Sequence, residues 1–330
     1  MSSITILGAG AWGTALAQSL ACAGQAISMW CHESDVAVSI NAERRNHLFL
    51  GEIEIDPLVT ATTRMEAVSP NDIVILAAPA QFMRAVLRAH RAVGHRPRVY
   101  VCVAKGIERD TGALMSDVLS QEAPDVQIAV LSGPSFAADV ARGLPTAVTL
   151  ACADADCARD TAKALQTPNL RPYISTDVIG AEIGGAVKNV LAIACGIVVG
   201  RQLGASAHAA LVARGYAEMK RFAVALGARA ETMAGMSGLG DLVLTCSHAQ
   251  SRNMSFGIAL GEGRNPAEIL AERRVVTEGA ATAPILARLA HEKSVEMPIT
   301  AAVDTIISQR VSVDSAISDL LSRPIKYEAI

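Results

Sequence analysis

Residues 4–17 read ITILGAGAWGTALA, and this stretch decides the fold of the first half of the chain. Its first four residues are rich in β-branched side chains and predict a strand, whereas Thr14–Ala23 predicts a helix. Between them Gly8, Gly10 and Gly13 form the pattern G-x-G-x-x-G. These glycines permit a tight turn, close approach of the backbone to a pyrophosphate, and close packing of helix on strand. In this strand–turn–helix setting the pattern predicts a dinucleotide site.

Outward from this turn, β-branched runs alternate with Ala/Leu-rich helical ones, which predicts βαβ units around a parallel sheet. The expected strands are Ile4–Leu7, Ala26–Trp30, Asp72–Ala77, Arg98–Val103, Gln127–Leu131 and, as a further candidate, Ala147–Ala151. From about Asp177 helical spacing takes over, and the expected helices are Glu182–Val199, Ala207–Leu226, Ser255–Leu260, Ala280–Glu292 and Ile299–Ile307. The sequence therefore predicts an α/β Rossmann-type doubly wound domain over residues 1–180, followed by an all-α domain over 181–330.

Composition argues against several classes of protein. The net charge is −3, and no Lys/Arg run exceeds the pairs 44–45 and 273–274, so we expect no nucleic-acid partner. No P-loop, nucleophile-elbow or zincin motif occurs. Seven cysteines without a C-x-x-C favour reduced thiols in the cytoplasm and no metal site. The longest apolar stretch, Val190–Gly200, is well short of the ~20 residues that a membrane span needs.

The end of the second strand bears on the choice of cofactor. An NAD-preferring site usually has Asp or Glu there, to bind the ribose 2′-hydroxyl. This chain reads Trp30-Cys31-His32-Glu33, which puts His32 at the expected acidic position. We therefore expect NADP(H), and NAD(H) as well because Glu33 follows directly. The alternative is that His32 is a solvated loop residue.

Two of the six lysines lie where a flexible surface lysine is not expected. Lys105 ends a buried-strand pattern, at the strand end where doubly wound sheets bind ligands. Lys188 shares one helical face with Gly180 and Gly184, and the missing side chains would let a group approach it closely. An ammonium in apolar surroundings has a lowered pKa, which suits it to proton transfer near neutral pH. The alternative for Lys188 is an interdomain salt bridge or a side chain extended to solvent.

Two further segments are candidates for polar chemistry. The glycine-rich stretch that begins at Gly235 has the composition of a mobile loop and ends in Asp241. Ser251-Arg252-Asn253 precedes a helical run, and a helix start with an added guanidinium is suited to bind an anion. Plain N-capping by Ser251 or Asn253, with Arg252 in solvent, explains the same residues equally well.

Taken in order, these motifs make a family recognisable. They are GAGAWGTALA (8–17), VAKGIE (103–108), LSGPSFAADV (131–140), EIGGAVKNVLAIACGI (182–197), GLGDLVLTC (238–246), SRN (251–253), VVTEG (275–279) and RPIKYE (323–328). Together they closely resemble the bacterial NAD(P)-dependent glycerol-3-phosphate dehydrogenases, over essentially the whole chain. The combination of GPSFA, EIGGAxKN, GLGDLxxTC and SRN is highly specific to that family.

The resemblance implies an N-terminal Rossmann-type domain, a helical C-terminal domain and an active site between them. It implies interconversion of dihydroxyacetone phosphate and sn-glycerol 3-phosphate, for phospholipid synthesis, with Lys188 as the catalytic acid/base. The positions matching substrate contacts are Lys105, Gly133, Ser135, Lys188, Asp241, Ser251, Arg252 and Asn253. Those matching cofactor contacts are Ala11, Trp12, His32, Lys105, Ala137, Arg252, Val276 and Glu278. The interpretation allows a homodimer, and Asp241 would hold Lys188 protonated and oriented.

The chain departs from the family at two places. Ser206 and His208 replace Asn and Lys of the family stretch GDNAKAALI, and Ser247–Gln250 changes the usual approach to SRN. Two other functions are alternatives. A reductase of another hydroxy acid, such as a β-hydroxyacid dehydrogenase, would not need the SRN segment, and a non-catalytic NADP(H)-binding regulator would be expected to lose Lys188 or Asp241.

Overall fold

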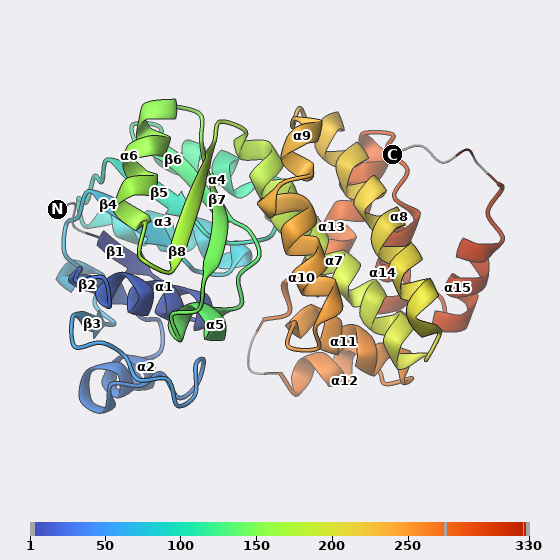
Figure 1. The fold of residues 1–330 in the computed structure, drawn as a ribbon, viewed down its shortest axis with the longest axis horizontal. Helices are drawn as coiled ribbons and strands as arrows, with labels where there is room; N and C mark the ends of the chain where they lie inside the picture. Colours follow the sequence, from blue (N-terminus) through green and yellow to red (C-terminus); the bar gives the residue numbers. More distant parts are fainter. Residues whose placement is uncertain (1–3, 274–275, 326, 328–330) are drawn as a thin grey trace. The chain divides into compact units, whose positions relative to one another are not determined.

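The computed structural model describes residues 4–273, 276–325 and 327 (Figure 1). The chain forms two compact units, Met1–Ala104 with Leu114–Ala181, and Lys105–Ala113 with Glu182–Ile330. The segment 105–113, which sequence reasoning assigned to the first domain, thus packs within the second unit. Val275 of the VVTEG motif, and Lys326 and Glu328 of RPIKYE, lie outside the described residues.

The first unit is built on an 8-stranded sheet. Its strands are β1 (Ile4–Leu7), β2 (Ile27–Trp30), β3 (Val59–Thr62), β4 (Ile73–Leu76), β5 (Val99–Cys102), β6 (Gln127–Ser132), β7 (Thr146–Cys152) and β8 (Leu170–Ser175). They are ordered β3-β2-β1-β4-β5-β6-β7-β8, and every neighbouring pair is parallel except β6 and β7. The order reverses between β1 and β4, so the turn after β1 opens at the crevice where such sheets bind ligands.

The predicted α/β class is confirmed, and each of the six predicted strands is present with ends shifted by at most a few residues. β1, β4 and β5 are buried on both faces and largely apolar, which made their sequence signal strong. Two strands were missed. β3 is four residues long and half-exposed, and β8 contains Pro172, which an edge strand tolerates because its outward N–H groups need no partner.

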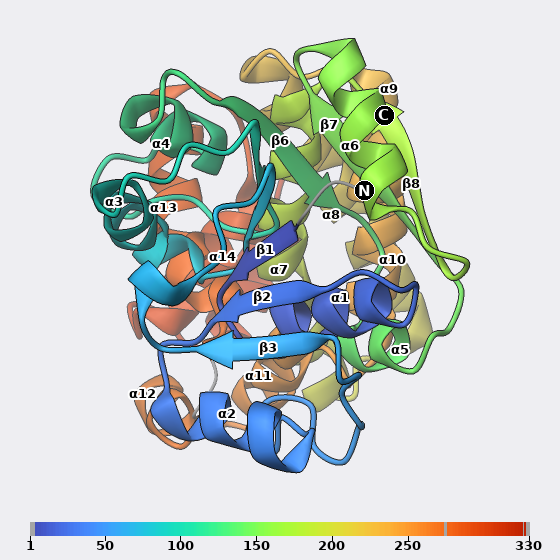
Figure 2. The same cartoon turned by 90° about the vertical axis from the view of Figure 1, so that its left-hand side faces the viewer.

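Helices flank the sheet of the first unit. They are α1 (Ala11–Ala21), α2 (Ser34–Val38), α3 (Met83–Ala92), α4 (Met115–Glu122), α5 (Ala137–Ala141) and α6 (Ala155–Leu165), with short turns η1 (Ser39–Glu43), η2 (Met65–Ala67) and η3 (Ala80–Phe82). Figure 2 shows α3 and α4 on one side of the sheet and α1 with α5 on the other. Helix α1 begins three residues before the predicted Thr14, because the third glycine of the turn is already helical.

A buried polar group lies between α3 and β5. His90 Nδ1 and the Tyr100 hydroxyl are 2.9 Å apart, and His95 Nδ1 lies 3.1 Å from His90 Nε2. His90 and Tyr100 are fully buried. Burial, with a smaller effect of His95, lowers the pKa of His90 to about 4. The first unit therefore holds this imidazole in its neutral form.

The second unit is helical. Its helices are α7 (Val178–Gly200, which starts in the first unit), α8 (Gly204–Ala225), α9 (Ala230–Met233), α10 (Asp241–Ser247), α11 (Arg252–Gly261), α12 (Pro266–Ala271), α13 (Glu278–Glu292), α14 (Pro298–Ile307) and α15 (Val313–Leu321), with the turn η4 (Met236–Gly240). Only α7 is long and apolar enough to cross a membrane, among the residues described, and 89% of its most apolar window is buried inside the protein. It is therefore placed as the core helix of this unit.

Helices α7 and α11 pack backbone against backbone. A Cβ added to Gly196 of α7 would lie 2.1 Å from the Met254 carbonyl oxygen, and one added to Gly257 of α11 would lie 2.0 Å from that of Ile193. Gly200 and Gly261 repeat the contact one turn further on. Because no side chain separates the two helices, their spacing is fixed by the backbones themselves.

Candidate active site

The turn after β1 has the geometry that the glycine pattern predicts. Gly8 has φ +119°, donates its N–H to the Trp30 carbonyl at 2.9 Å, and lies so close to Ala77 that a Cβ would approach its carbonyl carbon to 2.7 Å. A Cβ on Gly13 would lie 2.1 Å from the Gly8 oxygen. The first and third glycines are therefore required by the protein's own packing.

Gly10 differs from the other two glycines of the turn. A Cβ there would have no atom within 4 Å, so the space beside it is open. It is the N-cap residue of α1 and has no side chain to occupy the first N–H groups of that helix. Open space in front of free N–H groups at a helix start fits a pyrophosphate, so these residues fit a bound dinucleotide.

Other residues implied for the cofactor gather around this turn. Trp12, at the start of α1, and Ala137, at the start of α5, pack against the same small apolar cluster. The Trp12 Nε1 atom is buried without a hydrogen-bond partner in the described part of the chain. His32 is exposed at the end of β2, and its ring lies 6.2 Å from that of Trp30. Phe82 ends the turn η3 that follows β4, and it is 58% exposed.

Gly133 and Ser135 lie in the first unit, directly after β6. Gly133 has φ +150°, and a Cβ there would approach the Val148 Cα to 3.0 Å. The Ser135 hydroxyl donates to the Gly133 carbonyl at 3.0 Å. This turn leads into α5, so both residues precede a helix start at the end of a strand.

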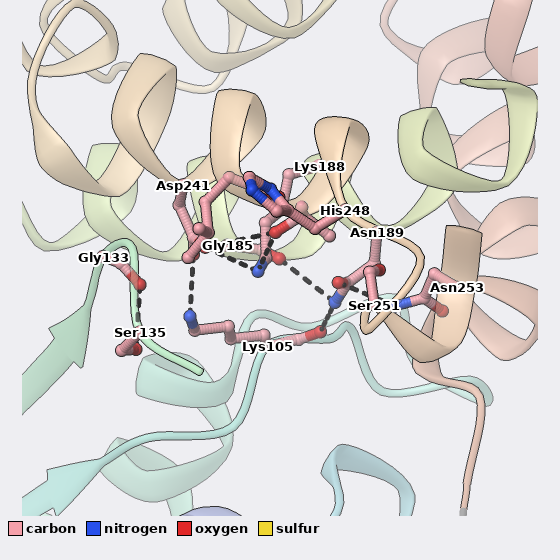
Figure 3. A network of polar contacts seen from close by, with 12 residues as sticks. Lys105, Gly133, Ser135, Gly185, Lys188, Asn189, Asp241, His248, Ser251 and Asn253 are labelled. Atoms are coloured by element: carbon pink, nitrogen blue, oxygen red, sulfur yellow. Dashed lines mark hydrogen bonds and ion pairs between the residues drawn. The ribbon is translucent and has the colours of Figure 1, made fainter. Parts of the chain in front are cut away.

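In the second unit two lysines bind one carboxylate (Figure 3). Lys188 Nζ donates to Asp241 Oδ1 at 2.6 Å, and Lys105 Nζ donates to Oδ2 of the same side chain at 2.7 Å. Asp241 is 1% and Lys188 7% exposed, so this pair is nearly removed from water. Lys188 thus takes part in a salt bridge, but with a partner inside its own unit.

Thr245 completes the surroundings of the Lys188 ammonium. Its hydroxyl accepts a hydrogen bond from Lys188 Nζ at 2.7 Å and lies 3.3 Å from Asp241 Oδ1. Thr245 follows Asp241 by four residues on α10, so both face the same side of that helix. Sequence reasoning missed this residue, although the four-residue spacing within GLGDLVLTC was a usable signal.

Burial has a direct effect on the chemistry of Lys188. It lowers the pKa of Lys188 to about 8, because desolvation penalises the ammonium. The Asp241 carboxylate opposes this shift, and the positive charge of Lys105 adds to it. An amine with such a pKa exchanges its proton near neutral pH.

The α7 helix is in close contact with the backbone of another segment at Gly184. A Cβ on Gly184 would lie 2.1 Å from the Ser237 carbonyl oxygen, which belongs to the turn η4. Ser237 and Gly238 are buried, so the segment with the composition of a mobile loop is a packed turn that leads into α10. This close contact positions Asp241 beside Lys188 one helical turn along α7.

A chain of amide hydrogen bonds connects three segments of the second unit. Asn189 Nδ2 donates to the Lys105 carbonyl at 3.1 Å, and Asn189 Oδ1 accepts from Asn253 Nδ2 at 2.9 Å. Asn253 Oδ1 in turn accepts from the N–H of Gly279 at 2.9 Å. These bonds, drawn in part in Figure 3, join the segment after β5 to α7, α11 and the start of α13. Asn189 was also missed, although it adjoins Lys188 in the sequence.

The three residues of the SRN segment do not all follow one interpretation, since capping explains Ser251 and anion binding remains open to Arg252. Ser251 caps α11, since its hydroxyl accepts from the N–H of Met254 at 3.3 Å, whereas Asn253 does not cap. Arg252 is exposed, and its Nη1 donates to the Val276 carbonyl at 3.1 Å. Glu278 begins α13 two residues later. Arg252 therefore retains further N–H donors at the start of a 10-residue helix.

The family departures lie in α8, which carries Ser206 and His208, and at the end of α10, where Ser247–Gln250 begins. His208 Nε2 is 2.8 Å from the Cys246 carbonyl, and His248 Nδ1 is 3.1 Å from that of Leu244. Both imidazoles thus contact carbonyls of the helix that carries Asp241. All seven cysteines are free thiols, as expected for a chain without disulfides.

A dinucleotide turn in one unit and a buried lysine with a near-neutral pKa in the other define a class, the nicotinamide-dependent oxidoreductases. Comparison with known proteins agrees. Models of the N-terminus and C-terminus of NAD-dependent glycerol-3-phosphate dehydrogenase match residues 3–158 and 177–318. The chain belongs to the NAD-dependent glycerol-3-phosphate dehydrogenase family.

Individual relatives cover the whole chain. It is 54% identical over 98% of its length to glycerol-3-phosphate dehydrogenase [NAD(P)+] of Hyphomonas neptunium, with 97% of that protein covered. The corresponding protein of Maricaulis maris is 52% identical, with 99% of this chain and 98% of that protein covered. The crystal structure of glycerol-3-phosphate dehydrogenase from Coxiella burnetii is 37% identical and has a TM-score of 0.93, with 98% and 99% of the two chains covered.

Proposed function

We propose that this enzyme reduces dihydroxyacetone phosphate to sn-glycerol 3-phosphate with NAD(P)H, reversibly, and so supplies glycerophospholipid synthesis. The observation that carries the proposal is the buried Lys188 ammonium, held by Asp241 and Thr245 in the unit that contains the SRN segment. Family membership supports the same reaction, because the relatives are named as glycerol-3-phosphate dehydrogenases.

Reduction of the ketone needs one hydride and one proton. The dinucleotide, when bound, supplies the hydride to the carbonyl carbon. Lys188 would act as general acid and transfer a proton from Nζ to the carbonyl oxygen, where negative charge develops. Its pKa of about 8 leaves it mostly protonated at neutral pH and makes its proton easier to give than that of an ordinary lysine.

Asp241 and Thr245 would orient this proton donor. Each accepts a hydrogen bond from Lys188 Nζ, which leaves the third ammonium proton for a substrate oxygen. Lys105 brings a second positive charge to the same carboxylate. Two ammonium groups against one carboxylate give the cluster a net positive charge, which favours an anionic substrate and a developing oxyanion.

The SRN segment would bind the substrate phosphate. The α11 helix start presents N–H groups, and Arg252 adds a planar fork of donors. Asn253 is tied to Asn189, the neighbour of Lys188, at 2.9 Å, so the proposed anion site and the proton donor are linked through two buried amides. Gly133 and Ser135 are proposed as further substrate contacts, from the resemblance.

We also propose that Gly8, Gly10, Ala11, Trp12, Gly13, His32, Ala137, Val276 and Glu278 contact the cofactor, together with Lys105 and Arg252. NADPH is expected to serve at least as well as NADH, because the end of β2 presents His32 in place of an acid. A cytoplasmic location is supported by the seven free thiols. A homodimer is proposed from the resemblance only.

The test follows NADPH and NADH absorbance in parallel with dihydroxyacetone phosphate and with unphosphorylated dihydroxyacetone. Charge-assisted bonds to the phosphate contribute about 1.5–3 kcal/mol each, so kcat/KM should be far higher for the phosphorylated ketone. Lys188→Met should lower kcat by about 10²–10⁴-fold, whereas Lys293→Met, which removes an exposed lysine of the same unit, should leave kcat unchanged. Equal kcat/KM for the two ketones would refute the proposed substrate.

A further inference from the structure

The carboxyl ends of β2 and β3 lie side by side at one edge of the sheet (Figure 2). The two strands are parallel, and their register pairs Trp30 with Thr62. Pairing continues beyond the strands, since the N–H of Cys31 donates to the Thr62 carbonyl at 2.8 Å and Trp30 Nε1 donates to that of Thr63 at 3.0 Å. The segments that follow β2 and β3 are therefore held together.

This register places His32 and Arg64 at equivalent positions. Each lies two residues beyond the paired residues Trp30 and Thr62. Arg64 keeps an extended backbone, with φ −93° and ψ 117°, after a bend at Thr63. His32 and Arg64 thus follow neighbouring, paired strand ends at the same distance in sequence.

The positive charge of Arg64 is unpaired among the residues described. Its side chain is exposed, and its guanidinium takes part in no hydrogen bond or ion pair among the residues described. By contrast, Arg44 donates to three backbone carbonyls, and Arg45 pairs with Glu52 at 3.0 Å. Glu33, which follows His32 and caps α2, forms no ion pair with Arg64 in the described part of the chain.

We propose that Arg64 is a specificity-determining residue that, with His32, binds the 2′-phosphate of NADP(H). The proposal rests on the proposed function, because it places the adenosine ribose at the end of β2, where this class of sheet binds it. A guanidinium is the group best suited to a phosphate, which it binds through two parallel N–H bonds. The 2′-hydroxyl of NAD(H) offers no such anion, so Arg64 would distinguish the two cofactors.

Binding measurements test the role of Arg64 independently of catalysis. Dissociation constants are measured by titration calorimetry for NADPH, NADH, 2′,5′-ADP and 5′-AMP, with the wild type and with Arg64→Gln. Removing one charge-assisted phosphate contact at an exposed position should weaken NADPH and 2′,5′-ADP about tenfold and leave NADH and 5′-AMP unchanged. Arg159→Gln removes an exposed arginine from α6 of the same unit and should change none of the four.

Unchanged binding of 2′,5′-ADP to Arg64→Gln would overturn the proposal, and so would an equal loss for NADPH and NADH. Far-ultraviolet circular dichroism shows whether the variant is folded, as expected for an exposed side chain. The proposed function is tested separately, by comparing NADPH binding with turnover of dihydroxyacetone phosphate in the wild type. A wild type that binds NADPH but does not reduce dihydroxyacetone phosphate would refute that function and leave the assignment of Arg64 intact.

Discussion

The pH dependence of the reaction should report the ionisation of Lys188. With a pKa of about 8, this lysine is about 90% protonated at pH 7 and about 10% at pH 9. Ketone reduction uses the ammonium, so kcat/KM for dihydroxyacetone phosphate should fall about tenfold for each unit above pH 8. Oxidation of glycerol 3-phosphate uses the neutral amine and should rise over the same interval.

The fall in kcat/KM above pH 8 is the alkaline limb of the pH profile. Two variants should shift this limb in opposite directions. The lysines hold different oxygens of one carboxylate, so their charges lie roughly 5 Å apart and interact by about 3 kcal/mol at an effective dielectric constant of about 20. Lys105→Met removes this repulsion and should raise the pKa of Lys188, by up to about 2 units. Asp241→Asn removes the attraction and should lower it.

The assay is kcat/KM from pH 6 to about 10, the range over which a lysine of this kind titrates, with Lys188→Met as reference. That variant should lose about 10²–10⁴-fold in kcat and show no limb at all, while Asp241 keeps Lys105 as its partner. A limb that stays at the same pH in both Lys105→Met and Asp241→Asn would refute the assignment of the limb to Lys188.

Three further outcomes are expected. Arg252→Lys keeps the charge but loses the planar fork, so KM for dihydroxyacetone phosphate should rise; an unchanged KM would mean that Arg252 is only a solvated side chain. His90 has a pKa of about 4 when folded against an ordinary 6.5, so lowering the pH from 7 to 5 should remove about 2 kcal/mol of unfolding free energy, measured in urea. His90→Gln can keep the bond to Tyr100 without titrating, and an equal loss in that variant would contradict this explanation. Gly257→Ala places a Cβ 2.0 Å from the Ile193 carbonyl oxygen and should lower the free energy of unfolding by about 1–3 kcal/mol. Gly263→Ala is its control: a Cβ there is open to solvent, and although φ +92° makes the variant strained, kcat should be unchanged.

Periodicity predicted the parts of the fold that are regular and buried. β1, β4 and β5 are covered on both faces, so their sequences are almost wholly apolar, with Thr5 of β1 as the exception. Half-exposed β3 and proline-containing β8 gave no such signal, because edge positions tolerate polar residues and lack of an N–H. α15 was also missed, since Ala316 is its only buried residue and little of it faces the core.

The candidate site was predictable as a set of residue types but not as a geometry. Lys105 and Lys188 stood out because lysines are rare at buried positions. That both bind Asp241 depends on segments 53 and 136 residues apart in sequence, which periodicity does not relate. The open face predicted beside Gly184 is filled by the Ser237 backbone, because an absent side chain admits main chain as readily as a ligand.

The placement of residues 105–113 limits how the protein can be divided. Only Val103 and Ala104 separate Lys105 from the end of β5, although Lys105 belongs to the second unit. A fragment that starts at Glu182 would leave Asp241 with one lysine in place of two and would leave Asn189 without the Lys105 carbonyl. Exchange of whole domains with a relative would bring in a foreign version of that segment. Recombination between relatives is therefore expected to preserve the charge cluster only when residues 105–113 are inherited together with the helical unit.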